Sequence, residues 1–456
     1  MELQQRSGRR QGNLSFAGSG SRFGSTKLAT AMVRGVLMLA VLAALVLMAA
    51  LPAQGQTETV LYNFCSQANC LDGFVPEGTL TFDSAGNLYG TTVYGGVYGL
   101  TGPGTVFELS PNGNGGWNES VLYNFAGGTD GANPWSNVIF DSAGNLYGTT
   151  YFGGGGYDYC EYGCGTVFEL SPTGSGWTET ILHAFSGSDG YYPQGNLMMD
   201  SAGNIYGTTE ESVFELSPSG GGWTFETIYQ NDETFLGGGM MMDGAGNLYG
   251  ASNKYVFELS PNGEGGWQEP RNLYGFTSTE EKNGSFPTGS LVMFEGNIYG
   301  VIGREEKGGK VYSLSQITSG KHKGQWRFTA LHSFTGGTKN GSDAWGGLLL
   351  WPGPYNSYYL FGATAGGGEY CKGGCGTVYG LGWEGLNQWI FQLLVSFNDS
   401  DGAGPCSSLI PDSAGNLYGT TEGGGIGAWD NYSGGTVFEV TGATLVKQNG
   451  GSADRR

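Results

Sequence analysis

The chain has 456 residues, of which 88 are glycine, and its 40 acidic residues outnumber its 20 basic residues to give a net charge of −20. This charge disfavours nucleic acid and anionic membrane surfaces as partners, because few cationic side chains can neutralise phosphate. The aromatic content of 13% argues against a disordered glycine-rich chain, in which aromatic residues are scarce.

The N-terminal segment has the pattern of a secretory signal. Residues 35–51 are apolar, Lys27 and Arg34 precede them, and Pro52-Ala53-Gln54 follows. The apolar stretch is short for a membrane span and has a small-residue exit. We therefore predict a leader and signal peptide over residues 1–53, so that the protein is periplasmic, extracellular or at the cell surface. An uncleaved N-terminal anchor is the alternative. Without residues 1–53 the net charge is near −25, with 39 acidic and 14 basic residues.

One ten-residue segment recurs through the rest of the chain. Residues 141–150 read DSAGNLYGTT, and close copies begin at Asp83, Asp200, Asp243 and Asp412. The Asp-x-x-Gly-Asn core supplies the side chains and the positive-φ residue of a tight hairpin turn. Asn297 marks a further copy and residues 359–362 a degenerate one, which makes seven copies at spacings of 43 to 62 residues.

Each repeat continues with a Gly-rich loop and two more strands. Examples are Gly165 to Leu170, and Trp177 to Phe185, which a Ser-Pro-x-Gly-x-Gly turn separates. Apolar residues alternate with a period of two, as in strands with one buried face. With its strands named a, b, c and d, the repeat predicts an all-β fold over residues 57–440: a seven-bladed β-propeller of four-stranded antiparallel blades.

The ends of the repeat array predict how the ring closes. Only six d strands follow the seven c strands, and they begin at Trp117, Trp177, Trp223, Trp267, Trp326 and Trp389. Thr57 to Phe64 has the d pattern and precedes every a strand. We predict that it pairs with Gly435 to Val440 in the last blade, because such closure protects strand edges. Residues 441–456 are then a polar tail.

The composite repeat resembles a known family. Leu-Tyr-Asn-Phe, Asp-Gly-x-x-Pro, the DSAGNLYGTT segment and Gly-Thr-Val-Phe-Glu-Leu together resemble the GloVer tandem repeat of exported bacterial proteins with a variable choice of cell-surface anchor. The hairpin is more distantly similar to NHL-type propeller repeats. The resemblance covers residues 57–440 and implies no catalytic motif. Repeats four and five depart from it, at Asn253-Lys254 and at Glu295-Gly296.

Six of the seven cysteines form three close pairs, which predict disulfides in an exported chain. The pairs are Cys65 with Cys70, Cys160 with Cys164 and Cys371 with Cys375, and Cys406 is left over. The alternative is a zinc site, but the two CxxxC pairs lie in repeats two and six, far apart around a ring.

Binding residues are expected on one face of the ring. The a–b and c–d turns share one face and are uniform, whereas the b–c and d–a loops share the other and vary, as binding loops do. From the Asp-Gly segments and the variable loops we select as ligand-binding candidates Asp72, Asp130, Asp189, Asp401, Tyr151, Tyr157, Tyr191, Trp429, Asp158, Glu369 and Asp430.

The repeated Asp-Gly-x-x-Pro segment has two interpretations. A ring of carboxylates could coordinate Ca²⁺ or bind sugar hydroxyls beside the aromatic side chains. Alternatively, each Asp caps its own d–a turn and each Pro sets the start of the next a strand. Because the segment repeats with the blade, we favour the structural interpretation and expect no cofactor.

No catalytic residue is predicted, since no Ser/His/Asp set, HExxH motif or phosphate loop is present. The pattern favours an exported, non-enzymatic scaffold that binds a glycan, a peptide or a cell-envelope component through the b–c/d–a face, with membrane contact only through an uncleaved signal segment. One alternative is a carbohydrate-active hydrolase or lyase that uses Asp158, Glu161, Glu369 and Asp430. The other is a self-associating surface protein.

Overall fold

The computed structural model divides the chain into two compact units, Met1–Gly55 and Gln56–Arg456. It describes residues 56–230, 236, 238–276, 286–303, 308–353, 357–383, 389–426 and 434–443, all of which belong to the second unit. The predicted signal peptide and nearly all of the predicted C-terminal tail lie outside these residues. Within them, no helix has the length and apolar character needed to cross a membrane.

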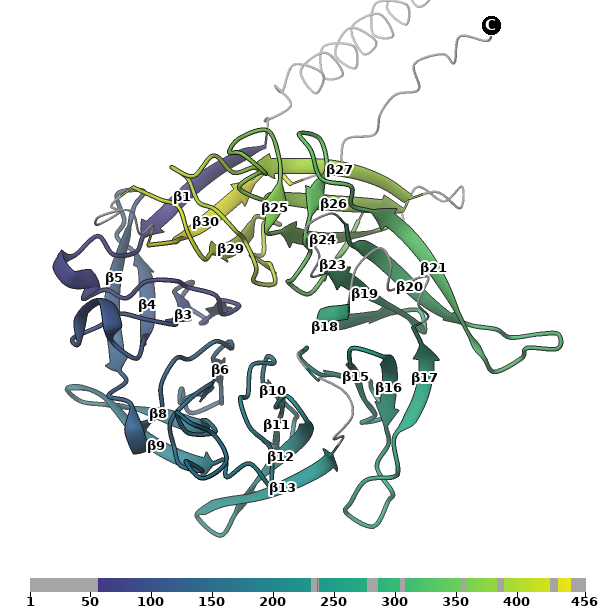
Figure 1. Ribbon diagram of the computed structural model, residues 1–456, viewed down its shortest axis with the longest axis horizontal. Helices are drawn as coiled ribbons and strands as arrows, with labels where there is room; N and C mark the ends of the chain where they lie inside the picture. Colours follow the sequence, from purple (N-terminus) through teal and green to yellow (C-terminus); the bar gives the residue numbers. More distant parts are fainter. Residues whose placement is uncertain are drawn as a thin grey trace, which may run out of the picture. The chain divides into compact units, whose positions relative to one another are not determined.

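The second unit is a ring of seven antiparallel four-stranded sheets, as Figure 1 shows, and this confirms the predicted all-β propeller. Blades 1 to 3 consist of β2 (Thr81–Phe82), β3 (Leu88–Thr92), β4 (Thr105–Pro111) and β5 (Trp117–Asn124); β6 (Ile139–Phe140), β7 (Leu146–Thr150), β8 (Thr166–Thr173) and β9 (Gly176–Ala184); β10 (Met198–Met199), β11 (Ile205–Thr208), β12 (Ser212–Ser219) and β13 (Gly222–Gln230).

Blades 4 to 6 follow the same order. They consist of β14 (Met241–Met242), β15 (Leu248–Ala251), β16 (Tyr255–Leu259) and β17 (Arg271–Gly275); β18 (Phe286–Phe294), β19 (Asn297–Gly303), β20 (Lys310–Gln316) and β21 (Trp326–Ser333); β23 (Leu349–Pro352), β24 (Tyr358–Thr364), β26 (Thr377–Trp383) and β27 (Trp389–Ser396).

The last blade joins the two ends of the described chain. It consists of β28 (Ile410–Pro411), β29 (Leu417–Thr421), β30 (Thr436–Thr441) and β1 (Thr57–Asn63). β1 pairs with β30 from Thr57 opposite Thr441 to Asn63 opposite Thr436, and Figure 1 shows the purple strand beside the yellow one. The predicted closure of the ring by an N-terminal d strand is confirmed.

Each repeated Asp holds its hairpin turn through several hydrogen bonds. Asp141 accepts the backbone N–H groups of Ala143 at 2.8 Å and Asn145 at 2.9 Å, and also the Asn145 side-chain amide and the Tyr147 hydroxyl. The side chain therefore pairs backbone donors that the tight turn leaves free. This explains why Asp, Asn and Tyr recur together.

Apolar side chains of neighbouring blades bury one another. One cluster joins Tyr147 of blade 2 to Leu197, Ile205 and Phe214 of blade 3. Trp223 at the start of β13 packs edge-on against Tyr147, with ring centroids 5.5 Å apart. A single blade cannot bury both of its faces, so the seven blades depend on one another.

The fourth blade differs from the expected pattern. Its d strand, β17, begins at Arg271 and not at Trp267, and Trp267 forms an isolated bridge to Pro261 outside the strand. Pro270 lies between the two positions, and proline has no N–H to donate to a strand ladder. The ladder can therefore continue only after Pro270.

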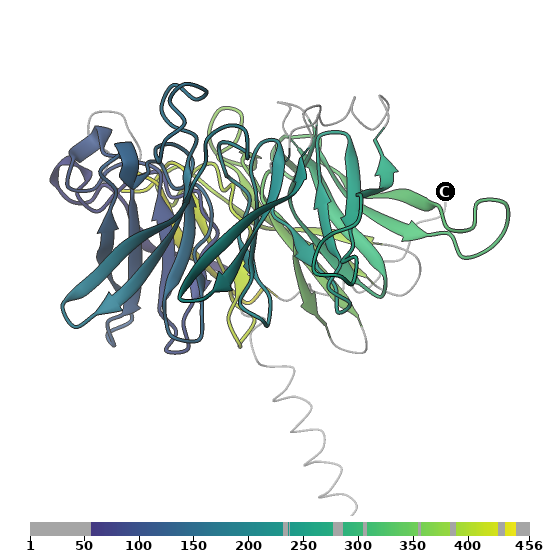
Figure 2. The same ribbon diagram turned by 90° about the horizontal axis from the view of Figure 1, so that it is seen from below.

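The b–c and d–a loops pair with each other on one face. Isolated bridges join Phe74 to Tyr94, Ala132 to Phe152 and Ala403 to Gly423, and in blade 6 the same contact forms β22 (Gly341–Ser342) with β25 (Gly366–Gly367). Figure 2 shows short 3₁₀ turns of these loops along the upper edge of the ring. The loops contain η1 (Ala68–Cys70), η2 (Gly99–Thr101) and η3 (Gly128–Asp130). We call this the loop face.

Candidate functional site

A pocket of about 410 Å³ opens at the centre of the loop face. Its walls come from all seven blades, so it lies on the axis of the ring. Most lining residues belong to the segments that lead into the a strands, and others directly follow b strands. We call it the axial pocket.

A repeated backbone device directs one residue of a blade into the axial pocket. A residue with φ near +60° begins the device and donates its N–H to a carbonyl of the preceding blade in the ring. Asn133 of blade 2 donates to Pro103 of blade 1 in this way, and Val75 of blade 1 donates to Gly434 of blade 7 across the closure of the ring. Proline or alanine follows. The next residue lines the pocket, and these axial positions hold Glu77, Trp135, Gln194, Trp345 and Cys406.

The positive φ angles at this device are unusual. Val75 has φ 60°, Asn133 55°, Tyr192 55° and Asp343 60°, and in blade 7 the position is Gly404. A β-branched residue such as Val75 is strained in this region, and such strain persists only where the surrounding structure fixes it. The device therefore recurs although its residue types do not.

Hydrogen bonds between blades form part of the pocket wall. The Thr79 hydroxyl of blade 1 accepts the Asn196 amide of blade 3 at 3.2 Å and the Ser408 N–H of blade 7 at 3.3 Å. The Ser408 hydroxyl accepts the Gly347 N–H at 2.9 Å. These bonds tie four blades together around the axis.

Three carboxylates from different loops line the axial pocket: Glu77, Asp343 and Glu422. Burial, followed by the charge of Glu422, raises the pKa of Glu77 to about 7. Partial burial and then Asp343 raise the pKa of Glu422. Among the described residues that line the pocket, none is Lys, Arg or His. The described lining of the pocket is therefore acidic.

Two residues that line the axial pocket each have a buried donor group without a partner among the described residues. Trp135 Nε1 and Gln194 Nε2 are inaccessible to solvent, and neither makes a hydrogen bond within the described residues. The Trp135 ring packs against Tyr151, with centroids 4.3 Å apart, and the Tyr151 hydroxyl donates to Glu210 at 3.0 Å. An unpaired buried donor costs about 1–3 kcal/mol, which an acceptor on a ligand or a water would recover.

Cys406, which had no predicted role, also lies in the axial pocket. Burial, then the nearby Glu77 and Glu422, raises the pKa of its thiol well above the usual value. The thiol is therefore protonated at neutral pH and is a weak nucleophile.

A second cavity lies between the loops of blades 1 and 2. It measures about 770 Å³ and is lined by aromatic and small residues that include Phe74, Tyr94, Phe152, Tyr157 and Tyr162. Phe74 stacks on Tyr94 at 5.3 Å, and Phe152 meets Tyr162 edge-on at 5.5 Å. We call it the aromatic groove.

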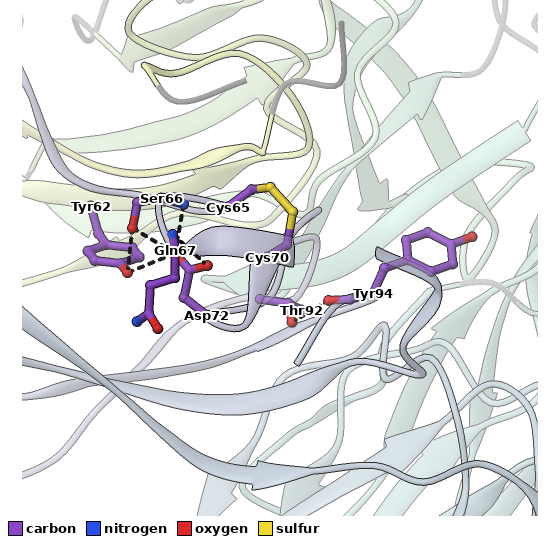
Figure 3. Close-up of a disulfide and its surroundings, with 8 residues drawn as sticks. All are labelled: Tyr62, Cys65, Ser66, Gln67, Cys70, Asp72, Thr92 and Tyr94. Atoms are coloured by element: carbon purple, nitrogen blue, oxygen red, sulfur yellow. Dashed lines mark hydrogen bonds between the residues drawn. A yellow bond between two sulfur atoms is a disulfide. The ribbon is translucent and has the colours of Figure 1, made fainter. Parts of the chain in front are cut away.

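The four predicted Asp residues of the Asp-Gly segments cap their own d–a turns. Asp72 is fully buried and accepts the Tyr62 hydroxyl, the Ser66 hydroxyl and the Ser66 and Gln67 N–H groups (Figure 3). Asp130 accepts from Tyr123 and Ala126, and Asp401 accepts from Asn398. These contacts are those expected if each Asp caps its own turn.

Asp189 caps its turn in the same way, but its side-chain partner is a histidine where other repeats have a tyrosine. Its carboxylate lies 2.9 Å from His183 Nε2 and accepts the Ser186 N–H and hydroxyl. His183 thus occupies the position of Tyr62 and Tyr123 in other repeats, which donate to their own Asp in the same way.

The other predicted site residues fall in different places. Tyr157 lines the aromatic groove with Glu161, whereas Asp158 and Glu369 are exposed and line neither cavity. The Tyr191 hydroxyl donates to Glu211, and Tyr151 stacks on Tyr192. Trp429 and Asp430 lie outside the described residues. In the part of the chain that the structure describes, no three His, Cys, Asp or Glu side chains are grouped to hold a metal ion.

The three predicted disulfides form, and all lie on the loop face. They join Cys65 to Cys70, Cys160 to Cys164 and Cys371 to Cys375. The first closes the turn that also contains Asp72 (Figure 3). The second closes residues 160–164, which include Tyr162 of the aromatic groove and lie shortly after Tyr157.

Sequence reasoning missed the axial positions. The signal was present in the column after the proline of each Asp-Gly-x-x-Pro segment, where Glu77, Trp135, Gln194 and Cys406 stand in four different repeats. A position that varies while its neighbours repeat does not serve the blade itself.

Comparison with known proteins identifies the repeat. A family model described as the Gloeobacter/Verrucomicrobia repeat matches residues 4–212 and 46–255, more than half of the chain, in agreement with the resemblance seen in the sequence. No curated protein is detectably similar.

Solved structures with a similar arrangement include a putative 6-phosphogluconolactonase from Bacteroides uniformis, at 12% identity and a TM-score of 0.43, over 71% of this chain and 86% of that one. A protein of unknown function from Dyadobacter fermentans has 10% identity and a TM-score of 0.42, over 75% and 100%. At these TM-scores the likeness carries no argument about function.

Proposed function

Because this chain belongs to the Gloeobacter/Verrucomicrobia repeat family, we propose that it is an exported repeat scaffold that binds a neutral glycan in the aromatic groove. Three disulfides in a bacterial repeat protein favour a periplasmic or extracellular location, since thiols stay reduced in the cytosol. The export signal predicted over residues 1–53 would deliver it there.

The exposed tyrosines of the aromatic groove carry this proposal. Tyr94 is 40% exposed, Tyr157 53% and Tyr162 62%, although large aromatic side chains are usually buried. Clustered exposed apolar surface marks a binding site. A tyrosine offers an apolar ring face and a polar hydroxyl, which match the C–H face and the hydroxyls of a sugar ring.

The charge of the groove favours a neutral glycan over an anionic one. Among the described residues that line it, Glu161 is the single charged side chain, and none is basic. A carboxylate accepts hydrogen bonds from sugar hydroxyls but repels sulfate or uronate groups.

The groove is held in shape before a ligand arrives. The Cys160–Cys164 disulfide closes the loop that follows Tyr157. The Phe74–Tyr94 bridge joins the two loops that form the blade 1 wall, and the Ala132–Phe152 bridge joins the two loops that form the blade 2 wall. A preorganised site loses less conformational entropy on binding. This rigidity favours recognition of a repeated unit along a glycan chain.

The alternative of a hydrolase or lyase has less support. Asp158 and Glu369 line neither cavity, so of the four carboxylates predicted for such chemistry only Glu161 faces the groove among the described residues. Acid/base cleavage of a glycosidic bond needs two carboxylates flanking one bond.

A glycan array probed with the purified exported protein tests the proposal. We expect binding to neutral glycans, and at least tenfold weaker binding by the Tyr157→Ala/Tyr162→Ala variant. Tyr370→Ala is the matched control, because Tyr370 is also exposed and precedes a loop disulfide, in blade 6. A blank array, or equal binding by both variants, would contradict the proposal. Concentration-dependent light scattering with no glycan binding would instead indicate self-association.

A further inference from the structure

We propose that the glycan site extends from the aromatic groove across the b–c loop of blade 2 and takes a neutral chain of several sugar units. The proposal rests on the proposed function, since it names the length of the ligand that the same groove binds. The added surface consists of Tyr159, Tyr191 and Tyr192, which lie outside the lining of the groove. We call this surface the tyrosine patch.

The b–c loop of blade 2 carries aromatic side chains on two sides. Tyr157 lines the aromatic groove, whereas Tyr159 lies against the d–a segment that leads into blade 3. A Cβ on Gly187 of that segment would lie 2.3 Å from Tyr159 Cγ. Residues two positions apart have Cα atoms within about 7 Å of each other. One extended ligand can therefore contact both sides of the loop.

Contacts between rings connect the aromatic groove with the tyrosine patch. Phe152, which lines the groove, meets Tyr192 edge-on with ring centroids 5.5 Å apart, and Tyr192 meets Tyr191 edge-on at 5.1 Å. The Tyr191 ring is in turn 5.7 Å from that of Tyr159, which is 64% exposed. The exposed aromatic surface thus continues beyond the groove, and continuous surface of this kind favours a ligand that spans it.

Tyr159 is held in position before a ligand arrives. Its N–H donates to the Gly156 carbonyl at 2.8 Å, and the Cys160–Cys164 disulfide follows directly. One side of its ring rests on Gly187, which has φ 93° and leaves no room for a Cβ. A rigid, exposed tyrosine offers contact area at a low cost in conformational entropy.

Hydrogen bonding and charge in the tyrosine patch favour neutral sugars. The Tyr191 hydroxyl donates to Glu211 at 2.5 Å, so its oxygen can only accept a hydrogen bond from a ligand, as a sugar hydroxyl would provide. Burial, then Glu210 and Glu161, raises the pKa of Tyr192, so carboxylates lie near this ring as well. Residues 56–253, which include blades 1 to 3, contain no Lys or Arg to pair with an anionic sugar.

Isothermal titration with neutral oligosaccharides of two and six units tests the proposal. The probes are β-1,4-linked glucose, β-1,4-linked N-acetylglucosamine and α-1,4-linked glucose. We expect the six-unit member of at least one series to bind at least tenfold tighter than its two-unit member, because only the longer chain reaches the tyrosine patch. Hexaproline, which fits aromatic grooves but has no hydroxyl donors, should bind more weakly than this six-unit glycan.

A variant of the tyrosine patch separates it from the groove. Tyr159→Ala should weaken six-unit binding about threefold to tenfold, as expected for the loss of one aromatic contact, and leave two-unit binding unchanged. Tyr370→Ala is the matched control, because Tyr370 is also exposed and directly precedes the Cys371–Cys375 disulfide. It should bind both lengths as the unmodified protein does. Thermal unfolding by circular dichroism checks that each variant is folded.

Equal binding of the two-unit and six-unit glycans would overturn the proposal, and so would six-unit binding that Tyr159→Ala leaves unchanged. Either result keeps glycan binding by the groove itself. Hexaproline binding as tight as that of the six-unit glycan would assign the tyrosine patch to a peptide and also overturn the proposal. Absence of binding by all three series up to millimolar concentration would refute the proposed function, and the extended site with it.

Discussion

At the scale of single residues, two tyrosines depart from the repeat at a buried position. The c strands of five blades place Phe under the glycine of the b strand, whereas blades 5 and 6 have Tyr312 and Tyr379. Both side chains are fully buried, and neither hydroxyl has a hydrogen-bond partner within the described residues. A buried hydroxyl without a partner is destabilising.

Tyr379→Phe should therefore stabilise the protein, by about 1 kcal/mol, because it removes the unpaired hydroxyl and restores the residue found in most repeats. Urea unfolding followed by tryptophan fluorescence measures the change. Tyr147→Phe is the control with the opposite sign, since its hydroxyl donates to Asp141 at 3.0 Å. A destabilised Tyr379→Phe variant would show that the hydroxyl is satisfied after all.

At the scale of the strand pair, the repeated glycine of Leu-Tyr-Gly allows the c strand to approach closely. A Cβ on Gly148 would lie 2.4 Å from the ring of Phe168, and Gly90, Gly207, Gly250 and Gly419 face their own Phe in the same way. The glycine thus makes room for the large ring that fills the blade.

Gly148→Ala should destabilise the protein by about 1–3 kcal/mol, because the added methyl group would overlap the buried ring of Phe168 and overpack the core. Gly174→Ala, in the open c–d turn of the same blade with no atom within 4 Å of the added group, should change the free energy of unfolding little. Thermal and urea unfolding compare the two. Equal effects of both substitutions would contradict the packing argument.

At the scale of the whole molecule, carboxylates repeat around the ring. Glu58, Glu119 and Glu179 stand on the d strands, and burial raises each pKa to about 7, with a smaller contribution from Asp401, Asp72 and Asp130 respectively. Their raised pKa means that the folded state binds protons more tightly than the unfolded state. The stability they contribute is complete below their ordinary pKa of 4.5 and is lost as pH rises through 7.

The turn aspartates act in the opposite direction. Partial burial opposes ionisation of Asp83, Asp141 and Asp243, but hydrogen bonds from their turns outweigh it and lower each pKa below 3.8. Their stabilisation is present above that value and is lost as pH falls through the lowered pKa. Together the two sets place the maximum of stability in mildly acidic solution.

The melting temperature should therefore rise as pH is lowered from 8 to about 5, and fall below about 4. Replacing Glu58, Glu119 and Glu179 together with Gln should flatten the rise between pH 8 and 5 and leave the acid limb in place. Scanning calorimetry across this range measures both limbs. A melting temperature that increases steadily from pH 5 to 8 would contradict the assignment.

Much of the fold could be predicted because its determinants are local and repeat. The DSAGNLYGTT turn specifies a hairpin from its own side chains, and seven copies specify seven blades. The d-type pattern of β1 at the wrong end of the chain predicted its pairing with β30. Short spacing was also enough for the disulfides, as for Cys160 and Cys164.

The axial pocket could not be predicted in this way. Glu77 and Glu422 lie at opposite ends of the repeat array, and no local pattern connects them with Trp135 or Gln194. Sequence alone determined what each repeat builds, because turns and strands depend on near neighbours. Only the tertiary structure decided which varied side chains meet, because closing the ring and turning the backbone at residues such as Val75 bring the same position of several blades to one axis.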